Sequence, residues 1–422
     1  MARLVARSTA DAPVGPSRVV IDLRPLQEPE RTPITAEYLA GLLEAFTADP
    51  LAGESFVVIG RALRPDPSVE LEARGLPVAG RRVLPPTSRV FRSAGLTLDS
   101  FLLRGAEAGT ADDGPVGSVY HTAGGAVPLA SQLPVVATLL DLAPWELPHT
   151  YAASPAARFG HRLRARVLHD AARVIVCSRA TAESARRRLQ LPSERLAVVR
   201  LAVSAAFRAA GADAALRAEI IGRLGLPERY LVFAGRYDAR KDMASLFAAL
   251  RDGGDERAGA GVAAGQPPVP VVLAGLFDAD SDEAALQRAA VRSGAADRLI
   301  VAPPLSDAER AALVGGALGF VYPALSEATG SRVLEALALG VPVICSRAGA
   351  LPEIVGGGGI IVEPRDPRRM ASAIAALTAG GSLAQQLQRA ARRHAETDRR
   401  TWQDVARETR QVYAAAGSRP AG

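Results

Sequence analysis

The sequence predicts an α/β protein with two Rossmann-like, doubly wound parallel-sheet domains that face a cleft. Short β-branched runs alternate with longer stretches of Ala, Leu and Arg at helical spacing along most of the 422 residues. Such alternation is typical of βαβ units, which build parallel sheets. The series is interrupted at 202–226 and then starts again. A chain of this length is also more readily divided into two domains than folded around one core.

In the first half, the runs rich in Val, Ile and Leu predict strands at 18–23, 55–60, 118–121, 134–139, 174–177 and 196–201. Apolar residues at helical spacing predict helices at 35–48, 98–106, 154–172 and 180–189. The stretch 202–226 shows a looser pattern, and we interpret it as the hinge between the domains.

In the second half, the same patterns predict strands at 230–234, 269–274, 298–301, 318–322, 341–345 and 359–362. Helices are expected at 243–250, 282–293, 307–316, 332–339 and 367–377. Residues 252–268 are rich in Gly, Ala and Asp and predict a surface insertion. After Ser382 the tail is expected to be helical, with Trp402 and Tyr413 as its packing anchors.

The composition is that of a soluble globular protein, with 48% hydrophobic and 22% charged residues. A net charge of +6 suits anionic ligands, and no basic stripe interleaved with aromatics points to nucleic acid. The N-terminal residues lack the apolar core of a signal peptide, and no apolar run has the length of a membrane span. Cys177 and Cys345 each end an apolar run, which predicts buried free thiols in a cytoplasmic protein.

Lys241 is the one lysine among 50 basic residues. It follows a predicted buried strand, a turn at Gly235 and the start of a helix, which is where α/β folds bind phosphates. Lysine is a compact, flexible point charge, whereas arginine is a planar fork. The alternative is that Lys241 is a chance survivor of a codon usage that favours arginine.

Glu327 and Glu335 flank the predicted start of a helix that follows a strand. The loop after such a strand lies at the ligand-binding edge of an open α/β sheet. Carboxylates there can accept hydrogen bonds from a diol, while a helix N-terminus and cations attract phosphate. On spacing alone, a capping Glu and a solvated helical Glu are the simpler explanation of the pair.

Residues 322–343 resemble the Glu-x7-Glu motif of the retaining glycosyltransferase family 4, in which the first Glu usually precedes Gly-Phe-Gly and Leu-Glu-Ala precedes Gly-x-Pro-Val. Residues 235–241, Gly-Arg-Tyr-Asp-Ala-Arg-Lys, resemble the Gly-Arg-x4-Lys phosphate site of that family. Residues 172–178 and 349–355 resemble a strand and a turn of the family, and the tail is similar to its last helix, which returns to the first domain. The resemblance runs from about residue 18 to residue 413 and is stronger in the second half.

The resemblance implies a GT-B-type hexosyltransferase that moves a sugar from a nucleotide diphosphate to an acceptor, with retention of configuration and without a metal. Arg236 and Lys241 would grip the diphosphate, Glu335 the ribose, and Glu327 the donor sugar. The implied donor site also includes Gly330, Ser331, Arg332 and Leu334. The acceptor would be a glycan, a lipid-linked molecule or a small molecule bound by residues 1–203, with the donor on 204–396 and a returning helix at 397–422.

The sequence departs from the family pattern at three places. Residues 33–38, Pro-Ile-Thr-Ala-Glu-Tyr, replace a glycine-rich turn, and Glu327 is followed by Ala-Thr-Gly. Leu140-Asp141-Leu142 stands where His-Asp-Leu is usual. His121, at the end of a neighbouring strand, is a candidate catalytic replacement for the missing imidazole, and a structural role is the alternative.

The departures leave two alternatives open: a pseudo-glycosyltransferase and a non-catalytic nucleotide-sugar-binding partner of another transferase. Asp278 and Asp280 form an Asp-x-Asp sequence that binds metal in another transferase architecture, although helix capping explains it more simply. Arg158, Arg162 and Arg166 predict a basic helix face, either solvated or in peripheral contact with anionic lipid at the inner face of the membrane.

Overall fold

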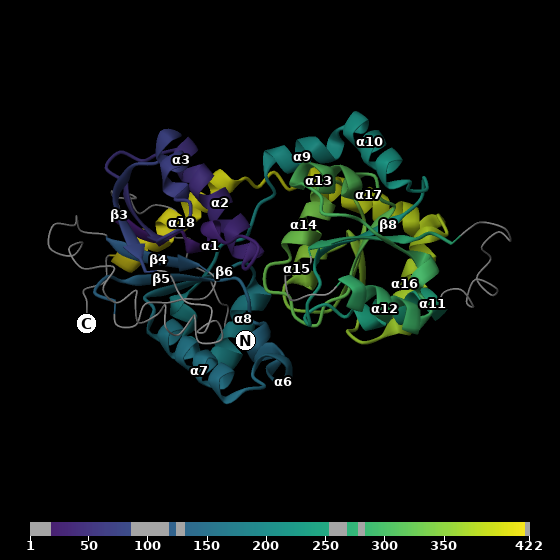
Figure 1. Ribbon diagram of the computed structural model, residues 1–422, viewed down its shortest axis with the longest axis horizontal. Coiled ribbons are helices and arrows are strands. Elements are labelled where there is room, and N and C mark those ends of the chain that lie inside the picture. The colour runs from purple at the N-terminus through teal and green to yellow at the C-terminus, as the bar shows by residue number, and fades with distance from the viewer. Residues whose placement is uncertain (1–17, 86–117, 124–130, 253–267, 277–282, 418–422) are drawn as a thin grey trace, which may run out of the picture.

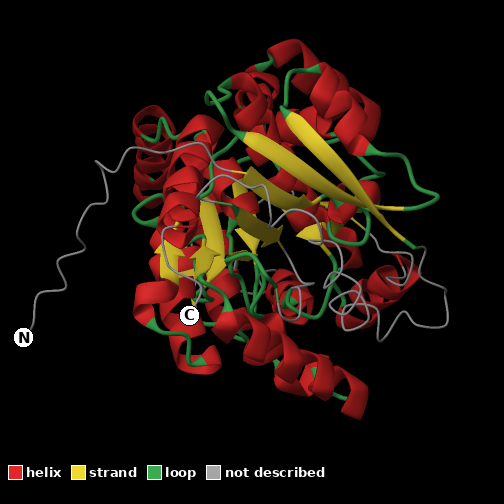
Figure 2. Ribbon diagram, turned by 90° about the vertical axis from the view of Figure 1, so that its left-hand side faces the viewer, coloured by secondary structure: helices red, strands yellow, loops and turns green. Residues whose placement is uncertain are grey.

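The computed structural model describes residues 18–85, 118–123, 131–252, 268–276 and 283–417. It contains two parallel β-sheets, each covered by helices on both faces (Figures 1 and 2). The predicted fold class, two doubly wound α/β domains, is therefore confirmed.

The first sheet has the strand order β3-β2-β1-β4-β5-β6-β7. Its strands are β1 (Arg18–Asp22), β2 (Ser55–Arg61), β3 (Val78–Leu84), β4 (Val119–Ala123), β5 (Val135–Leu139), β6 (Arg173–Val176) and β7 (Leu196–Val198). Its helices are α1 (Arg24–Gln27), α2 (Pro33–Ala48), α3 (Pro67–Ala73), α5 (Ala143–Glu146), α6 (Pro148–Tyr151), α7 (Pro155–Asp170) and α8 (Arg179–Leu189). In Figure 1, α2 and α3 lie above this sheet, and α6, α7 and α8 lie below it.

The second sheet has the order β10-β9-β8-β11-β12-β13. Its strands are β8 (Leu231–Arg236), β9 (Val271–Leu276), β10 (Leu299–Val301), β11 (Gly319–Tyr322), β12 (Val343–Ser346) and β13 (Gly359–Val362). The helices that follow its strands are α11 (Met243–Asp252), α12 (Glu283–Ser293), α13 (Asp307–Gly315), α14 (Ser331–Ala338), α15 (Leu351–Val355), α16 (Pro367–Thr378) and α17 (Ser382–Thr397). Both sheets reverse their strand order next to the first strand of the series, which places a switch point at β1/β4 and at β8/β11.

The structure corrects two expectations about secondary structure. Residues 202–226 are not loosely structured, because they contain α9 (Ala205–Ala212) and α10 (Ala214–Leu224), and their role as the hinge between the domains stays a prediction. The edge strand β3 was not predicted. The helix expected at 98–106, the Asp-x-Asp sequence at Asp278 and Asp280, and nearly all of the insertion expected at 252–268 lie outside the described residues.

The last helix, α18 (Trp402–Gly417), packs against α2 and against β4, β5 and β6 of the first sheet. Figure 1 shows it in yellow among the purple and blue elements of that domain. Tyr413 is fully buried there, and Arg410 donates two hydrogen bonds, of 2.9 and 2.7 Å, to the buried carboxylate of Glu54. These contacts join residues more than 350 positions apart in the sequence, and they fix the C-terminal helix to the first domain. The predicted domain boundaries, between residues 203 and 204 and between residues 396 and 397, stay predictions.

Candidate functional site

A pocket of about 140 Å³ lies between the two domains, at the carboxyl edges of both sheets. The first domain contributes the start of α2 and the segment after β5, and the second contributes the turn after β8, the end of β11 and the start of α14. The described lining residues are Arg31, Thr32, Pro33, Ile34, Thr35, Leu140, Asp141, Gly235, Arg236, Arg240, Lys241, Tyr322, Ser331 and Arg332. Ligands of open α/β sheets bind at this edge.

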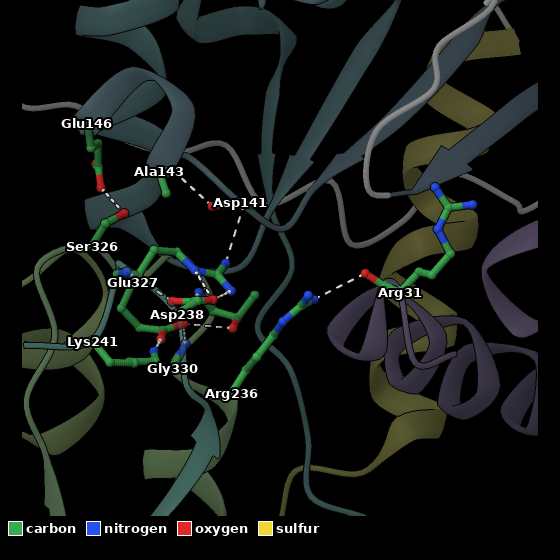
Figure 3. Close-up of polar contacts among 12 residues, drawn as sticks. Arg31, Asp141, Ala143, Glu146, Arg236, Asp238, Lys241, Ser326, Glu327 and Gly330 are labelled. Carbon is green, nitrogen blue, oxygen red and sulfur yellow. Dashed lines mark hydrogen bonds and ion pairs between the residues drawn. The ribbon is translucent and has the colours of Figure 1, made fainter. Parts of the chain in front are cut away.

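Lys241 lines this pocket and is held in an ion pair inside the second domain (Figure 3). Its Nζ donates to Glu327 Oε2 at 2.8 Å and to the Tyr322 hydroxyl at 2.5 Å, and it lies 4.1 Å from the centroid of the Tyr322 ring. The side chains of Lys241 and Glu327 are only 4% and 6% exposed. The residue that the resemblance assigns to the diphosphate and the one that it assigns to the donor sugar are therefore in direct contact.

Glu327 has both carboxylate oxygens occupied. Oε2 accepts from Lys241 and from the Tyr322 hydroxyl, the latter at 2.8 Å. Oε1 accepts from the backbone N–H and the hydroxyl of Thr329 and from the Gly330 N–H at 3.0 Å. Burial opposes ionisation, but the charge of Lys241 and these hydrogen bonds outweigh it and hold the pKa of Glu327 well below its ordinary value. Glu327 is thus a buried anion that shapes the loop before α14.

Two arginines join Lys241 on the same turn. Arg236 ends β8, and its NH1 donates to the backbone oxygen of Arg31 in the first domain at 3.2 Å. Arg240 donates to Asp238 through Nε at 2.9 Å and lies 3.4 Å from Asp141 of the first domain. Burial lowers the pKa of Arg240, but these carboxylates raise it by more. The net pKa lies above its ordinary value, so Arg240 is a fixed cation. Sequence analysis missed Arg240, which lies one residue before Lys241.

Glu335 lies one turn into α14, as predicted, and pairs with two arginines. Arg310 on α13 donates to its Oε2, and Arg332 donates to its Oε1 at 2.8 Å. Arg332 also donates to Glu37 on α2, so this cluster joins the two domains. Burial raises the pKa of Glu37, and its arginine neighbours only partly offset this. Leu334 packs against apolar side chains of the first domain and of α9.

Gly330, in the left-handed conformation at φ 63°, is the N-cap of α14, and its amide donates to Glu327 rather than being left for a ligand. Pro33 begins α2, so the segment that replaces the family's glycine-rich turn is a helix start that lines the pocket. Proline suits the first helical position, where its missing N–H costs no hydrogen bond.

The position of His121 corrects the hypothesis that it supplies a catalytic imidazole. Its side chain is 0% exposed and lies beneath α18, and it is not among the pocket-lining residues. Nε2 is 2.9 Å from the Thr138 hydroxyl, and Nδ1 is 2.7 Å from the Tyr413 hydroxyl. Burial lowers the pKa of His121 to about 3, so the ring is neutral and both nitrogens are used in the core.

Two protein families match segments of this chain. Residues 217–394 match the family described as "Glycosyl transferases group 1", and residues 100–207 match "Glycosyltransferase Family 4". The chain belongs to glycosyltransferase family 4. Both matches fall on the segments that flank the pocket, the first on β8 to α17 and the second on the half of the first domain that contains β5.

Among curated relatives of this family, the D-inositol 3-phosphate glycosyltransferase of Streptomyces avermitilis is 34% identical over 214 residues, which are 50% of this chain and 44% of the relative. The MMP alpha-(1->4)-mannosyltransferase of Mycolicibacterium hassiacum is 36% identical over 131 residues, which are 30% of this chain and 32% of the relative. Each match thus spans less than half of the relative's length.

Solved structures show the same fold at low identity. The sucrose-phosphate synthase of Thermosynechococcus elongatus superposes with a TM-score of 0.68 at 19% identity, over 94% of this chain and 98% of the other. Anabaena HepE, solved in complex with UDP and glucose, gives 0.64 at 15% identity, over 93% and 97%.

The described residues contain no group of three or more His, Cys, Asp or Glu side chains placed to hold a metal ion. In the same part of the chain, none of the helices combines the length and the apolar character needed to cross a membrane. The absence of a metal requirement stays a prediction.

Proposed function

We propose that this protein is a retaining hexosyltransferase that takes a sugar from a nucleoside diphosphate sugar. The observation that carries the proposal is the placement of Arg236, Arg240 and Lys241 on one turn at the carboxyl end of β8, where they line the pocket between the domains. Membership of glycosyltransferase family 4 supports the same function.

The three cations would bind the donor diphosphate and stabilise the charge that grows on it as the bond to the sugar breaks. Fixed cations in a pocket shielded from water do this effectively, because they need no reorganisation during the reaction. Arg240 is preorganised by Asp238, and Lys241 by Glu327. Lys241 already donates to Glu327 and Tyr322, so we propose that it shares its protons between Glu327 and the phosphate.

We propose a front-face route with retention, in which the leaving phosphate helps to deprotonate the acceptor. A double displacement would need a carboxylate nucleophile beside the sugar. Of the described residues that line the pocket, Asp141 is the one carboxylate, and it accepts from the Ala143 N–H at 2.8 Å and lies 3.4 Å from Arg240 (Figure 3). Glu327 is buried in its ion pair. Neither carboxylate is an available nucleophile.

The acceptor is proposed to approach from the first domain, as a glycan, a lipid-linked molecule or a small molecule. For a lipid-linked acceptor we propose contact of α7 with anionic lipid, because Arg158, Arg162 and Arg166 are exposed along one face and Phe159 is 61% exposed beside them. Cosedimentation with phosphatidylglycerol vesicles tests this contact, and equal binding by a variant with Ala at all three arginines would contradict it. The buried free thiols of Cys177 and Cys345 suit the cytoplasmic location that we propose.

The test of the function is transfer from UDP-, GDP- and ADP-hexoses to a panel of glycan, lipid-linked and small-molecule acceptors, with the anomeric configuration of the first product read by NMR. We expect a retained configuration, and a loss of about 100-fold or more in kcat/KM for Arg236→Ala. Arg347→Ala, which removes a 56% exposed arginine of the same domain, serves as the control and should match wild type.

An inverted product would contradict the proposed route. Binding of the donor without transfer or hydrolysis would favour the non-catalytic partner instead.

A further inference from the structure

The loop that contains Glu327 is held from outside its own domain. The residue before it, Ser326, is buried, and its hydroxyl donates to Glu146 Oε2 at 2.6 Å (Figure 3). Glu146 ends α5 in the first domain, and its Oε1 accepts from the Ser184 hydroxyl on α8, also at 2.6 Å. One carboxylate of the first domain therefore links its own helix α8 to the Glu327 loop.

A second contact reaches the residue after Glu327. The hydroxyl of Thr181, in the first turn of α8, donates to the backbone oxygen of Ala328 at 2.7 Å. Thr181 is 1% exposed, and Ser178 holds its hydroxyl from the other side at 2.8 Å. A buried carbonyl that loses its donor is costly, so this bond strongly favours one position of the loop.

The second domain supports the opposite side of the same loop. Ala350 N–H donates to the Glu327 backbone oxygen at 2.9 Å. Gly349 packs so closely that a Cβ there would lie 2.0 Å from that oxygen. The loop is thus clamped between its own domain and two polar side chains of the first domain, so half of this clamp depends on contact between the domains.

We propose that Glu146 and Thr181 are positioning residues that set the donor-sugar geometry of the Glu327 loop when the domains close. This inference rests on the proposed function. The diphosphate cations lie on a different segment, residues 236–241, and among the described residues neither Glu146 nor Thr181 forms a hydrogen bond to that segment. Loosening the loop should therefore disturb the sugar and leave most of the diphosphate affinity in place.

The sharpest variant is Thr181→Val, which removes the hydroxyl and keeps the shape, and Thr181→Ser is its conservative partner. Glu146→Ala removes both serine contacts, whereas Glu146→Gln can keep them because a serine hydroxyl can also accept from the amide. Arg179→Ala is the matched control. Arg179 is the first residue of α8 and is 87% exposed. Its Nε lies 3.5 Å from Glu353 Oε1 across the same interface, and among the described residues it forms no hydrogen bond or ion pair with the Glu327 loop.

The measurements are kcat for transfer and the dissociation constants of the donor and of its nucleoside diphosphate, taken with the best donor of the UDP, GDP and ADP series. We expect Thr181→Val and Glu146→Ala to lower kcat roughly 10- to 100-fold, as displaced positioning contacts do. Their affinity for the nucleoside diphosphate should stay within about threefold of wild type, and the extra affinity that the sugar adds should be lost. Thr181→Ser and Glu146→Gln should restore kcat, and Arg179→Ala should match wild type.

A kcat within about twofold of wild type in both truncating variants would overturn the inference, because one lost hydrogen bond corresponds to a fall in kcat of about tenfold. A parallel loss of kcat, diphosphate affinity and melting temperature would also overturn it, because that is the signature of a general interface contact. If the wild type binds these donors but transfers nothing, the proposed function fails by itself, and the ratio of donor to diphosphate affinity in Thr181→Val still tests the positioning.

Discussion

Replacing Lys241 by Ala should both inactivate the protein and destabilise it. The substitution removes the cation 2.8 Å from Glu327 Oε2 and leaves that carboxylate in a buried site. Breaking a buried ion pair in this way costs about 3–5 kcal/mol. We expect about 3 kcal/mol, the lower end, because Tyr322, Thr329 and Gly330 still donate to the carboxylate. For a domain of about 150–250 residues this corresponds to a fall in Tm of about 6–12 °C.

The double variant Lys241→Ala/Glu327→Gln separates stability from function. It removes the stranded charge, so its free energy of unfolding should return to within about 1 kcal/mol of wild type. Its kcat should stay about 100-fold or more below wild type, because the diphosphate has lost a cation. The assays are urea unfolding followed by circular dichroism, and donor turnover.

Three results would refute this reasoning. A free energy of unfolding for Lys241→Ala within about 1 kcal/mol of wild type would mean that no buried pair is broken. A double variant no more stable than the single one would mean that Glu327 is not the stranded group. A wild-type turnover rate in either variant would remove Lys241 from the diphosphate site.

Further predictions concern the same loop, the lysine itself and the core histidine. Lys241→Arg should lose at least about tenfold in kcat, because the planar guanidinium cannot replace a point charge between Glu327 and the Tyr322 ring. A wild-type rate would mean that the single lysine is a compositional accident. Gly349→Ala (φ 48°) should lower both stability and kcat, since its Cβ would lie 2.0 Å from the backbone oxygen of Glu327. Its control is Gly380→Ala (φ 71°), whose Cβ would have no atom within 4 Å. This control should cost only about 1–2 kcal/mol of backbone strain and no activity. Because the pKa of His121 is depressed, the unfolded chain binds a proton between pH 6.5 and about 3 that the folded chain excludes. The free energy of unfolding should therefore fall on acidification by up to about 1.4 kcal/mol per pH unit. His121→Gln should flatten that slope and keep kcat within about twofold of wild type.

The sequence predicted the fold class because the alternation of strand and helix patterns is strong in both halves. It missed α9 and α10, where Ala-rich segments carry little apolar periodicity; their signals were the caps Ser204 and Asp213, whose side chains accept from the first-turn N–H groups. It missed β3, whose adjacent Arg81 and Arg82 break the apolar pattern. An edge strand tolerates such charges because it is not buried on both faces.

Four of the predicted site residues, Arg236, Lys241, Ser331 and Arg332, line the pocket, but their arrangement was not predicted. The turn containing Lys241 and the loop containing Glu327 were readable because each follows a strong strand pattern. Their direct ion pair joins residues 86 positions apart, and no local pattern encodes such a pairing. The same holds for Glu146 and Thr181, which reach the loop across 180 and 147 residues.

The most direct test of the central claim, that the turn after β8 binds a diphosphate, is calorimetric titration of wild type and Arg236→Ala with the nucleoside di- and monophosphates of uridine, guanosine and adenosine. For the base that binds, wild type should prefer the diphosphate over the monophosphate by about tenfold or more, as one additional charge-assisted contact provides. Arg236→Ala should lose that preference and keep the monophosphate affinity. Equal affinity for di- and monophosphate in wild type, or an unchanged preference in Arg236→Ala, would contradict the account.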